Sequence, residues 1–531
     1  MAVAYSEPWR QSRDSDVHRR REKFLWFRVY ATFGLLTLLV GGTAYYSAPH
    51  PFSLVLLLMI VGMAAVLTRP IVGVYVIMFF TLIGDNATAA WYPFAKNMSS
   101  SESIFYMGDG LIVSPLEVFL IVTTVGWLLN YQDRLGQRVR VGRQFRRGTL
   151  LYPLMGFTFF VLYGYLQGMR TGGDRNVALW EMRPLLYVPM FYVLVTQLLT
   201  TRQQYVRLFK VAMVAVFVHA VFAINYFRGL PAVERAELES LGEHGASIHI
   251  DALLLLVLAL LLIKGCSPAL RVGMLLLAIP CLVAYAMAER RAAVVALVVG
   301  IVMLSIVIHR RNRRAFWWFV PITTVLGLGY LAAFWNAQGS LGFAAQAIKS
   351  VIAPGQLSEA DRSSDVYREF ERYDLWYTIR SDPLRGLGFG RQFYQPIPLP
   401  DISFFVFWQY LPHNSILWVW IKTGFFGFVS MLFLFARTVQ RGAINVARIA
   451  DPNHLALAIA ALGYVVMYIV FAYVDIAWDA RATIFLAFAM AWCGDFGNLE
   501  QTEELAEEDV EPAEEASADD SEYDEPLAVP S

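Results

Sequence analysis

One histidine and several arginines have the clearest capacity for chemistry in this sequence. Arg368 and Arg372 lie in a polar segment, and His413 and Asn414 follow it just before a long apolar run. Imidazole can take up and release a proton near neutral pH. A lone histidine at such a boundary is more often structural than catalytic. The arginines on the same segment nevertheless favour a general base at His413.

A second group of charges interrupts apolar sequence. Glu289, Arg290 and Arg291 break a stretch that is otherwise apolar from residue 272 to residue 308. A charge at membrane depth is costly, so it usually faces a cavity or a partner and marks a site. The structural alternative is a tight interfacial turn with both arginines reaching lipid phosphates. The same two interpretations apply to three arginines in the connection predicted between the fifth and sixth spans: Arg170, Arg175 and Arg183.

The polar segment from residue 365 to residue 391 predicts an amphipathic helix followed by a turn. Arg368, Arg372 and Leu375 or Trp376 recur three and four positions apart, which places an arginine pair beside an apolar stripe. Pro383 ends such a helix. Three alternate glycines then allow positive φ angles or a close backbone approach: Gly386, Gly388 and Gly390. Because no βαβ pattern surrounds them, they do not indicate a dinucleotide site.

The composition shows which elements must position these residues. Hydrophobic residues make up 57% of the 531 positions and charged residues only 16%, which excludes an ordinary soluble domain. A membrane-crossing helix needs about 20 apolar residues. We therefore predict an all-α, polytopic membrane protein with about fourteen spans: 26–46, 52–68, 70–84, 112–130, 150–167, 184–200, 207–227, 248–264, 272–288, 292–308, 315–335, 414–436, 454–474 and 482–496.

The distribution of basic residues predicts the orientation of these spans. Short cytoplasmic loops carry an excess of Lys and Arg. Clusters before the first span, at 134–147, at 310–314 and at 437–448 all fall on one side if the fourteen spans are real. The amino-terminal segment lacks a cleavage site, so we expect the first helix to stay as an anchor. Both termini are then cytoplasmic, and the long segment near 336–413 lies outside.

These predictions divide the chain into five parts. The tail carries fourteen acidic and no basic residues from Leu499 onward, which favours a disordered segment; a partner-binding tail is the alternative. Three scattered cysteines suit core positions: Cys266, Cys281 and Cys493. The predicted parts are a basic tail at 1–25, eleven spans at 26–335, an outer loop with short helices at 336–413, three spans at 414–496 and an acidic tail at 497–531.

The ordered set of motifs resembles the superfamily of O-antigen ligases and O-antigen polymerases. Members combine about a dozen membrane helices with one long periplasmic loop. That loop carries an arginine, an aromatic-rich helix, a Pro-Leu-x-Gly-x-Gly motif and a His-Asn pair. Arg368, the run from Pro383 to Gly388, and His413 with Asn414 match in order and approximate spacing. The resemblance covers roughly residues 150–490 and implies a GT-C-like fold in the bacterial inner membrane.

The resemblance also implies a reaction and its residues. A glycan would pass from undecaprenyl diphosphate to an acceptor hydroxyl in the periplasm, with inversion, and His413 would be the base. Arg291 and Arg368 would bind the diphosphate. Members usually carry a sequence near Ser-Arg-Gly where this chain has Arg290-Arg291-Ala292, so Arg290 is an alternative counterpart. Further substrate-binding residues predicted for this site are Arg183, Arg372 and Asn414.

Several alternatives remain open from the sequence. A metal-dependent transferase would place acidic residues in an early outer loop, but Asp85 and Asp109 lack a close acidic partner, so we expect no metal or other cofactor. A transporter or flippase of lipid-linked sugars would usually show internal repeats, and none is evident. A scaffold protein is the third possibility.

The expected partners are the lipid-linked glycan, a glycan or lipid acceptor and the bilayer, without nucleic acid. Ligase and polymerase share the donor and are not distinguished.

Overall fold

The computed structural model describes residues 51–84, 94–100, 106, 112–136, 148–237, 241–337, 339–357, 359–400 and 407–508. All regular elements in these ranges are helical. They are α2 (Pro51–Thr68), α3 (Pro70–Ile83), α4 (Pro115–Gly136), α5 (Leu151–Arg170), α6 (Arg175–Leu198), α7 (Arg202–Gly229), α8 (Ala232–Glu237), α9 (Ala246–Leu262), α10 (Pro268–Ala288), α11 (Arg291–Arg311), α12 (Arg313–Phe334), η1 (Gly339–Leu341), α13 (Phe343–Ile352), η2 (Pro354–Gln356), α14 (Glu359–Ser381), α15 (Ser415–Arg448), α16 (Pro452–Val474) and α17 (Ala480–Glu508).

The predicted spans from 52–68 to 482–496 all fall on helices, and the first, 26–46, lies outside the described residues. Seven of the described helices are long and apolar enough to cross a membrane: α7, α10, α11, α12, α15, α16 and α17. Shorter apolar helices occur at Met59–Thr68, Pro70–Ile83, Pro115–Leu129 and Ala246–Leu262. The chain is therefore an all-helical, polytopic membrane protein. The count of fourteen spans stays a prediction.

Apolar exposure on α12 fits a lipid-facing helix. Phe319 is its only buried residue, whereas Trp317, Trp318 and Val325 are each 67% exposed. In water such a surface would favour association, but in hydrocarbon it is the ordinary exterior of a spanning helix.

Several helix boundaries differ from the predicted ones, and α15 continues to Arg448, twelve residues past the boundary predicted at 436. α6 begins at Arg175, not near residue 184, because Asp174 caps it by accepting hydrogen bonds from the backbone N–H groups of Asn176 and Val177 at 2.8 and 3.0 Å. Arg175 and Arg183 therefore lie inside α6 and not in a loop. At the other end of the chain, α17 continues to Glu508, twelve residues past the boundary predicted at 496.

The chain divides into two compact units. The first comprises Met1–Gln144, Val211–Ala246 and Pro280–Glu289. Within it, α2, α3 and α4 pack against one another. Gly73 of α3 lies so close to α4 that a Cβ atom there would be 2.1 Å from the Thr123 hydroxyl. Small residues of this kind allow the close backbone approach that is common between membrane helices.

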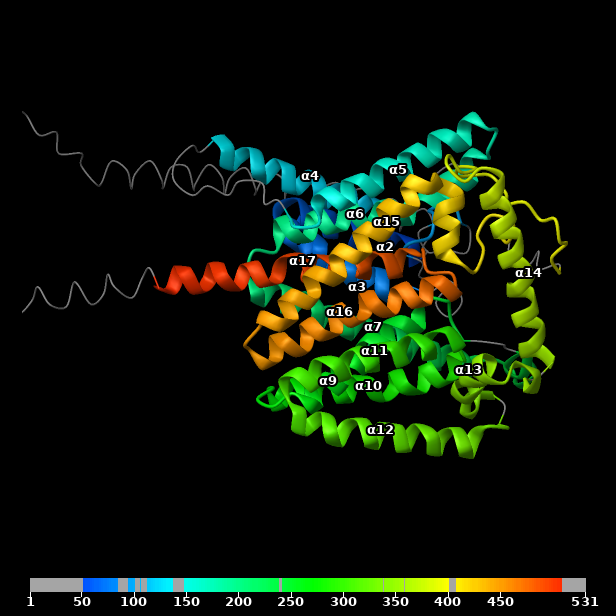
Figure 1. The fold of residues 1–531 in the computed structure, drawn as a ribbon. Helices are drawn as coiled ribbons and strands as arrows, with labels where there is room; N and C mark the ends of the chain where they lie inside the picture. Colours follow the sequence, from blue (N-terminus) through cyan, green and yellow to red (C-terminus); the bar gives the residue numbers. More distant parts are fainter. Residues whose placement is uncertain are drawn as a thin grey trace, which may run out of the picture. The chain divides into compact units, whose positions relative to one another are not determined.

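The second unit comprises Phe145–Lys210, Ser247–Ile279 and Arg290–Ser531. Its centre is formed by α15, α16 and α17, with α5 against α15, α6 against α17 and α11 against α16. Figure 1 shows these helices running alongside one another, with α14 lying across one end of α15 and α16. All the residues predicted to form the site lie in this unit.

The predicted amphipathic helix is confirmed as α14. Its apolar stripe packs on α15: Leu375 and Ile379 join Leu417 and Ile421 in one buried cluster. This helix ends at Ser381, two residues before Pro383. The packing of α14 on α15 places the predicted arginine segment beside the residues that precede α15.

The predicted role of the three alternate glycines is also confirmed. Gly386, Gly388 and Gly390 have φ angles of 71°, 84° and 76°. A Cβ atom on Gly388 would lie 2.1 Å from the backbone nitrogen of Gly168 in α5. The backbone N–H of Leu387 also donates to the Ile421 carbonyl at 2.7 Å. The turn therefore joins α5 and α15, and only glycine fits this approach.

A buried ion pair holds the same turn. Glu181 of α6 and Lys422 of α15 lie 2.7 Å apart, and both side chains are fully buried. The second carboxylate oxygen of Glu181 accepts a hydrogen bond from the backbone N–H of Gly390 at 2.6 Å. Lys422 donates to the backbone carbonyl of Arg391. These contacts fix the end of α14 relative to α6 and α15.

Candidate functional site

His413 lies directly before α15 and is held by a carboxylate from α14. Oε2 of Glu371 accepts a hydrogen bond from the backbone N–H of His413 at 3.0 Å. Oε1 of the same carboxylate lies 3.2 Å from the ring nitrogen Nδ1. Because a carboxylate only accepts, Nδ1 must be the donor. In a neutral imidazole the other nitrogen, Nε2, then carries the lone pair that can receive a proton.

The start of α15 explains why His413 has a defined position. Asn414 is the N-cap of this helix, and its side chain accepts from the backbone N–H of Leu417 at 2.9 Å. Such a cap stabilises a helix start. The ring of Tyr367 lies edge-on to His413, with centroids 5.7 Å apart. The imidazole is thus oriented by a cap, a carboxylate and a ring. Asn414 positions this start; its predicted contact with substrate stays a prediction.

A second contact joins the two predicted arginines through a carboxylate. Arg291, the first residue of α11, approaches Asp365 with both terminal nitrogens, at 3.0 and 3.4 Å. Arg368 lies 3.6 Å from the same carboxylate. The structure therefore brings Arg291 and Arg368 together around Asp365. This is the fork-to-fork geometry by which arginine binds planar carboxylates and phosphates.

The carboxylates that contact the arginine pair and the imidazole both belong to α14. Asp365, Arg368 and Glu371 follow one another at three-residue intervals on α14, so they lie on neighbouring faces over less than two turns. From Asp365 to Glu371 the rise along the axis is about 9 Å. The arginine pair and the imidazole therefore contact carboxylates on one short stretch of α14.

The inner face of α14 is buried and acidic. Burial, followed by the charges of Glu371 and Asp374, raises the pKa of Tyr367. Burial also raises the pKa of the Asp374 carboxyl, and Glu371 adds to it, while a hydrogen bond from the backbone N–H of Ile397 opposes the shift.

The other predicted site residues occupy different places. Arg290 is the N-cap residue of α11, one position before Arg291. Arg183 lies within α6, half-buried and two positions after Glu181. Arg372 is exposed and lines a cleft on the outer side of α14. The roles of these three arginines in substrate binding stay predictions.

The segment from Glu289 to Arg291 shows features of both interpretations, a tight turn and a charged contact. Only Glu289 and Arg290 separate α10 from α11, and Glu289 has a φ angle of 50°. A left-handed conformation is uncommon for a residue other than glycine. The segment is thus a tight turn, as in the structural interpretation, and Arg291 directly after it also contacts Asp365.

Two residues of the site, Glu371 and Asp365, are not among those predicted from the sequence. Glu371 has only 3% of its side chain exposed and shares its helix face with Tyr367 and Leu375. An acidic residue within an apolar stripe is unusual unless it has a partner. The sequence signal for Glu371 is therefore an acidic residue at helical spacing within an apolar stripe. Asp365 offers only its position one turn before Arg368.

The connection between α16 and α17 packs against the same helix start. The Ser415 hydroxyl donates to the Asp475 carbonyl at 3.0 Å and accepts from the backbone N–H of Ala477 at 2.9 Å. This connection contains Asp475 and Asp479, and Arg481 lies in the first turn of α17. The connection forms a buried support for the residue after Asn414.

The acidic residues considered for a metal fall in an undescribed part of the chain. Asp85 and Asp109 lie outside the described ranges. Within those ranges, no group of three or more His, Cys, Asp or Glu side chains could hold a metal ion. Metal independence therefore stays a prediction.

The fold and the site define a class of protein: a polytopic membrane protein with a carboxylate-held histidine and paired arginines at one end of its helices. Residues 273–432 match the family model described as O-antigen ligase, which confirms the predicted resemblance. A curated O-antigen ligase from Salmonella typhimurium is 27% identical over 139 residues, which are 25% of this chain and 34% of that protein. The chain thus spans about a third of this relative's length.

Proposed function

We propose that this chain is a membrane glycosyltransferase that moves a glycan from undecaprenyl diphosphate to an acceptor hydroxyl on the periplasmic side. The observation that carries the proposal is the arrangement on α14, where Arg291 and Arg368 share Asp365 and Glu371 holds His413. Fixed positive charge and an oriented base are the two requirements of this transfer. The similarity of residues 273–432 to the O-antigen ligase family supports the same reaction class.

The base acts on the acceptor. As the acceptor oxygen bonds to the anomeric carbon of the donor sugar, its proton passes to Nε2 of His413. The resulting imidazolium is stabilised by Glu371, whose buried carboxylate contacts Nδ1. Glu371 is a positioning residue here, because it acts through the imidazole.

The arginines act on the leaving group. The bond between the anomeric carbon and the diphosphate oxygen breaks, and its electron pair stays on the diphosphate. Arg291 and Arg368 neutralise that charge, and they cannot lose their own protons at working pH. Attack opposite the departing diphosphate inverts the anomeric carbon. A site at a membrane boundary lets the prenyl chain remain in lipid while reduced dielectric strengthens these contacts.

A reconstituted reaction tests the proposal. The protein in nanodiscs would receive the lipid-linked glycan that accumulates in cells lacking it, together with the cell's own acceptor. Transfer is followed as glycan-modified acceptor and as released undecaprenyl diphosphate. We expect His413→Ala to abolish both, and His309→Ala, an exposed histidine of α11, to leave both unchanged.

The same material separates the rival functions. A flippase would leave the lipid-linked glycan on the inner leaflet of cells lacking the protein, whereas loss of a transferase leaves it on the outer leaflet. Full transfer by reconstituted His413→Ala would refute the role of His413 as the base, whereas no transfer by the reconstituted wild type would refute the enzyme and favour a scaffold. The product distinguishes ligase from polymerase: a ligase modifies a lipid acceptor, and a polymerase lengthens the lipid-linked chain.

A further inference from the structure

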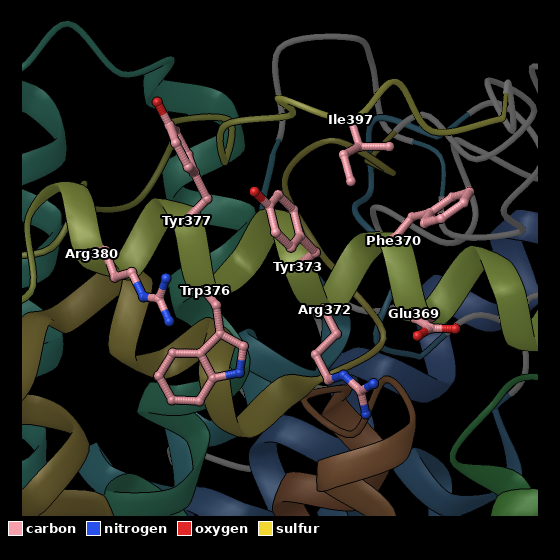
Figure 2. Close-up of a pocket in the computed structure, with 8 residues that line it drawn as sticks. All are labelled: Glu369, Phe370, Arg372, Tyr373, Trp376, Tyr377, Arg380 and Ile397. Carbon is pink, nitrogen blue, oxygen red and sulfur yellow. The ribbon is translucent and has the colours of Figure 1, made fainter.

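The outer side of α14 carries a cleft that the reaction described above does not use. It encloses about 420 Å³ and is lined by Glu369, Phe370, Arg372, Tyr373, Trp376, Tyr377, Arg380 and Ile397. Figure 2 shows these side chains along both edges of the helix: Arg372, Trp376 and Arg380 on one edge, and Phe370, Tyr373 and Tyr377 on the other. The volume is in the ordinary range of ligand sites.

The cleft has a defined second wall. Ile397 belongs to the extended segment after the glycine turn, and its backbone N–H donates to Oδ1 of Asp374 at 3.2 Å. Tyr377 lies edge-on to Tyr394 of the same segment, with centroids 6.4 Å apart. Trp376 is held on its other side by Trp420 of α15, 6.0 Å away. These contacts hold Ile397, Tyr377 and Trp376 in place beside the cleft.

The lining suits sugar rings. Tyr373, Trp376 and Tyr377 are 55%, 41% and 48% exposed, so their ring faces are accessible. Aromatic rings pack against the C–H faces of pyranoses, and arginine supplies fixed donors to sugar hydroxyls and carboxylates. Arg372, Trp376 and Arg380 recur every four residues, so two cations flank an aromatic platform over about 12 Å. A purely apolar partner would leave both cations buried without partners.

The position of the cleft indicates which glycan it meets. Glu369 follows Arg368 directly, and Arg372 lies one turn further along α14. The cleft therefore begins where the proposed diphosphate site ends. A glycan attached to that diphosphate would continue along the helix over Arg372 and Trp376.

We propose that the outer cleft of α14 binds the sugars of the lipid-linked donor that follow its first, reacting sugar. The proposal rests on the proposed function for the identity of the donor. It assigns Arg372 to glycan binding and not to the diphosphate. It also predicts that the protein distinguishes donors by the sugars after the first, at a surface separate from His413.

A binding experiment tests the cleft without any transfer. The probe is the lipid-free oligosaccharide released by mild acid from the accumulated lipid-linked glycan, and the protein is the full chain in nanodiscs. Trp376→Ala and the pair Arg372→Ala with Arg380→Ala should each weaken binding about tenfold. Trp376→Phe should retain most of the binding. Arg362→Ala and Val366→Ala are exposed changes on α14 outside the cleft and should have no effect.

Transfer kinetics identify the source of the glycan. Trp376→Ala should raise KM for the native donor about tenfold with little change in kcat. It should leave KM unchanged for a donor with a single sugar and for the acceptor. A raised KM for the acceptor alone would overturn the assignment to the donor.

Failure of the cleft proposal and failure of the transferase proposal give different results. Equal binding of the oligosaccharide by wild type and both variants would overturn the cleft proposal while leaving the transferase proposal intact. Loss of membrane incorporation in the variants, with unchanged oligosaccharide binding, would mark the face as a membrane contact and also overturn it. Specific oligosaccharide binding in a protein that transfers nothing would support the cleft and refute the transferase.

Discussion

Both carboxylate oxygens of Glu371 contact His413, one at the backbone N–H at 3.0 Å and one at ring Nδ1 at 3.2 Å. The backbone contact fixes where the residue lies, and the ring contact fixes which nitrogen faces away from α14. A single side chain thus determines both the position and the tautomer of the proposed base. Carboxylates behind a catalytic histidine act in the same way in hydrolytic triads.

Glu371→Gln should lower kcat at least about a hundredfold with normal protein level. The amide has one acceptor oxygen and one donor nitrogen, so it cannot satisfy both His413 contacts and favours the wrong tautomer. The double variant with His413→Ala should be no worse than His413→Ala alone, because the two residues act as one unit. Glu234→Gln, on exposed α8, is the control. Additive losses in the double variant would contradict a positioning role.

Arg291→Ala should reduce kcat/KM about 10- to 100-fold, the range expected for charged hydrogen bonds to a leaving group. Arg291→Lys should restore little, because lysine cannot make two parallel bonds. Arg310→Ala tests specificity, since that exposed arginine lies at the opposite end of α11. Steady-state kinetics with the native donor provide the measurement. Full rescue by lysine would show that charge alone is needed at this position.

Gly388→Ala should destabilise the protein by roughly 2 to 5 kcal/mol, because it combines a left-handed backbone with a severe contact. The added Cβ atom would lie 2.1 Å from the backbone of Gly168. Gly355→Ala is the matched change, since a Cβ atom added there would have nothing within 4 Å. Thermal unfolding in detergent, followed by size-exclusion chromatography, measures both. Equal unfolding temperatures for the two variants would refute the packing described for this turn.

Removing one member of the Glu181–Lys422 pair should cost about 3 to 5 kcal/mol, because it leaves a buried charge alone. Glu181→Gln and Lys422→Met should each lower the unfolding temperature, and the double variant should recover part of the loss. The recovery follows from removing both charges together. If the double variant were as unstable as the sum of the single changes, the two residues would not act as a pair.

Asp374 should make stability depend on pH. Burial raises the pKa of its carboxyl in the folded protein, so the folded state holds the proton more tightly than the unfolded chain. This contribution is fully present below the usual carboxyl pKa and is lost as pH rises through the folded value. Asp374→Asn keeps the oxygen that accepts from Ile397 but cannot ionise. The variant should therefore lose less stability than wild type as pH rises above the usual carboxyl pKa of about 4, as measured by unfolding temperature.

The helices and the main cations can be predicted from the sequence, but their partners cannot. Apolar runs of membrane length predict the spans, and the helical spacing from Arg368 to Leu375 predicts α14. Within the described residues, the structure has helices at all of these positions. Arg291 and Asp365 are 74 positions apart, and no periodicity connects them. Their contact depends on the tertiary packing that places α14 on α15 near the start of α11, which the local pattern does not contain.

The pairing of Glu181 with Lys422 also could not be predicted from the sequence. Because the sequence predicts that the sixth span begins after Arg183, Glu181 falls outside it. Pro184 within the helix favours that boundary, yet the Asp174 cap starts α6 nine residues earlier than predicted. Lys422 lies in an apolar run, where a lone lysine gives no indication of its partner in α6. Capping and tertiary pairing outweigh the helix-breaking tendency of one proline.

Asp365 has a consequence for what can enter the site. Asp365 already supplies an anion to both guanidinium groups, so an incoming phosphate has to displace this carboxylate before it gains either contact. A phospholipid headgroup, which is abundant and carries a single phosphate, replaces one anion with another and gains little. A diphosphate can exceed that exchange by contacting both arginines at once. If the arginines bind the donor as proposed, Asp365 favours a diphosphate over the single phosphates of the surrounding lipids.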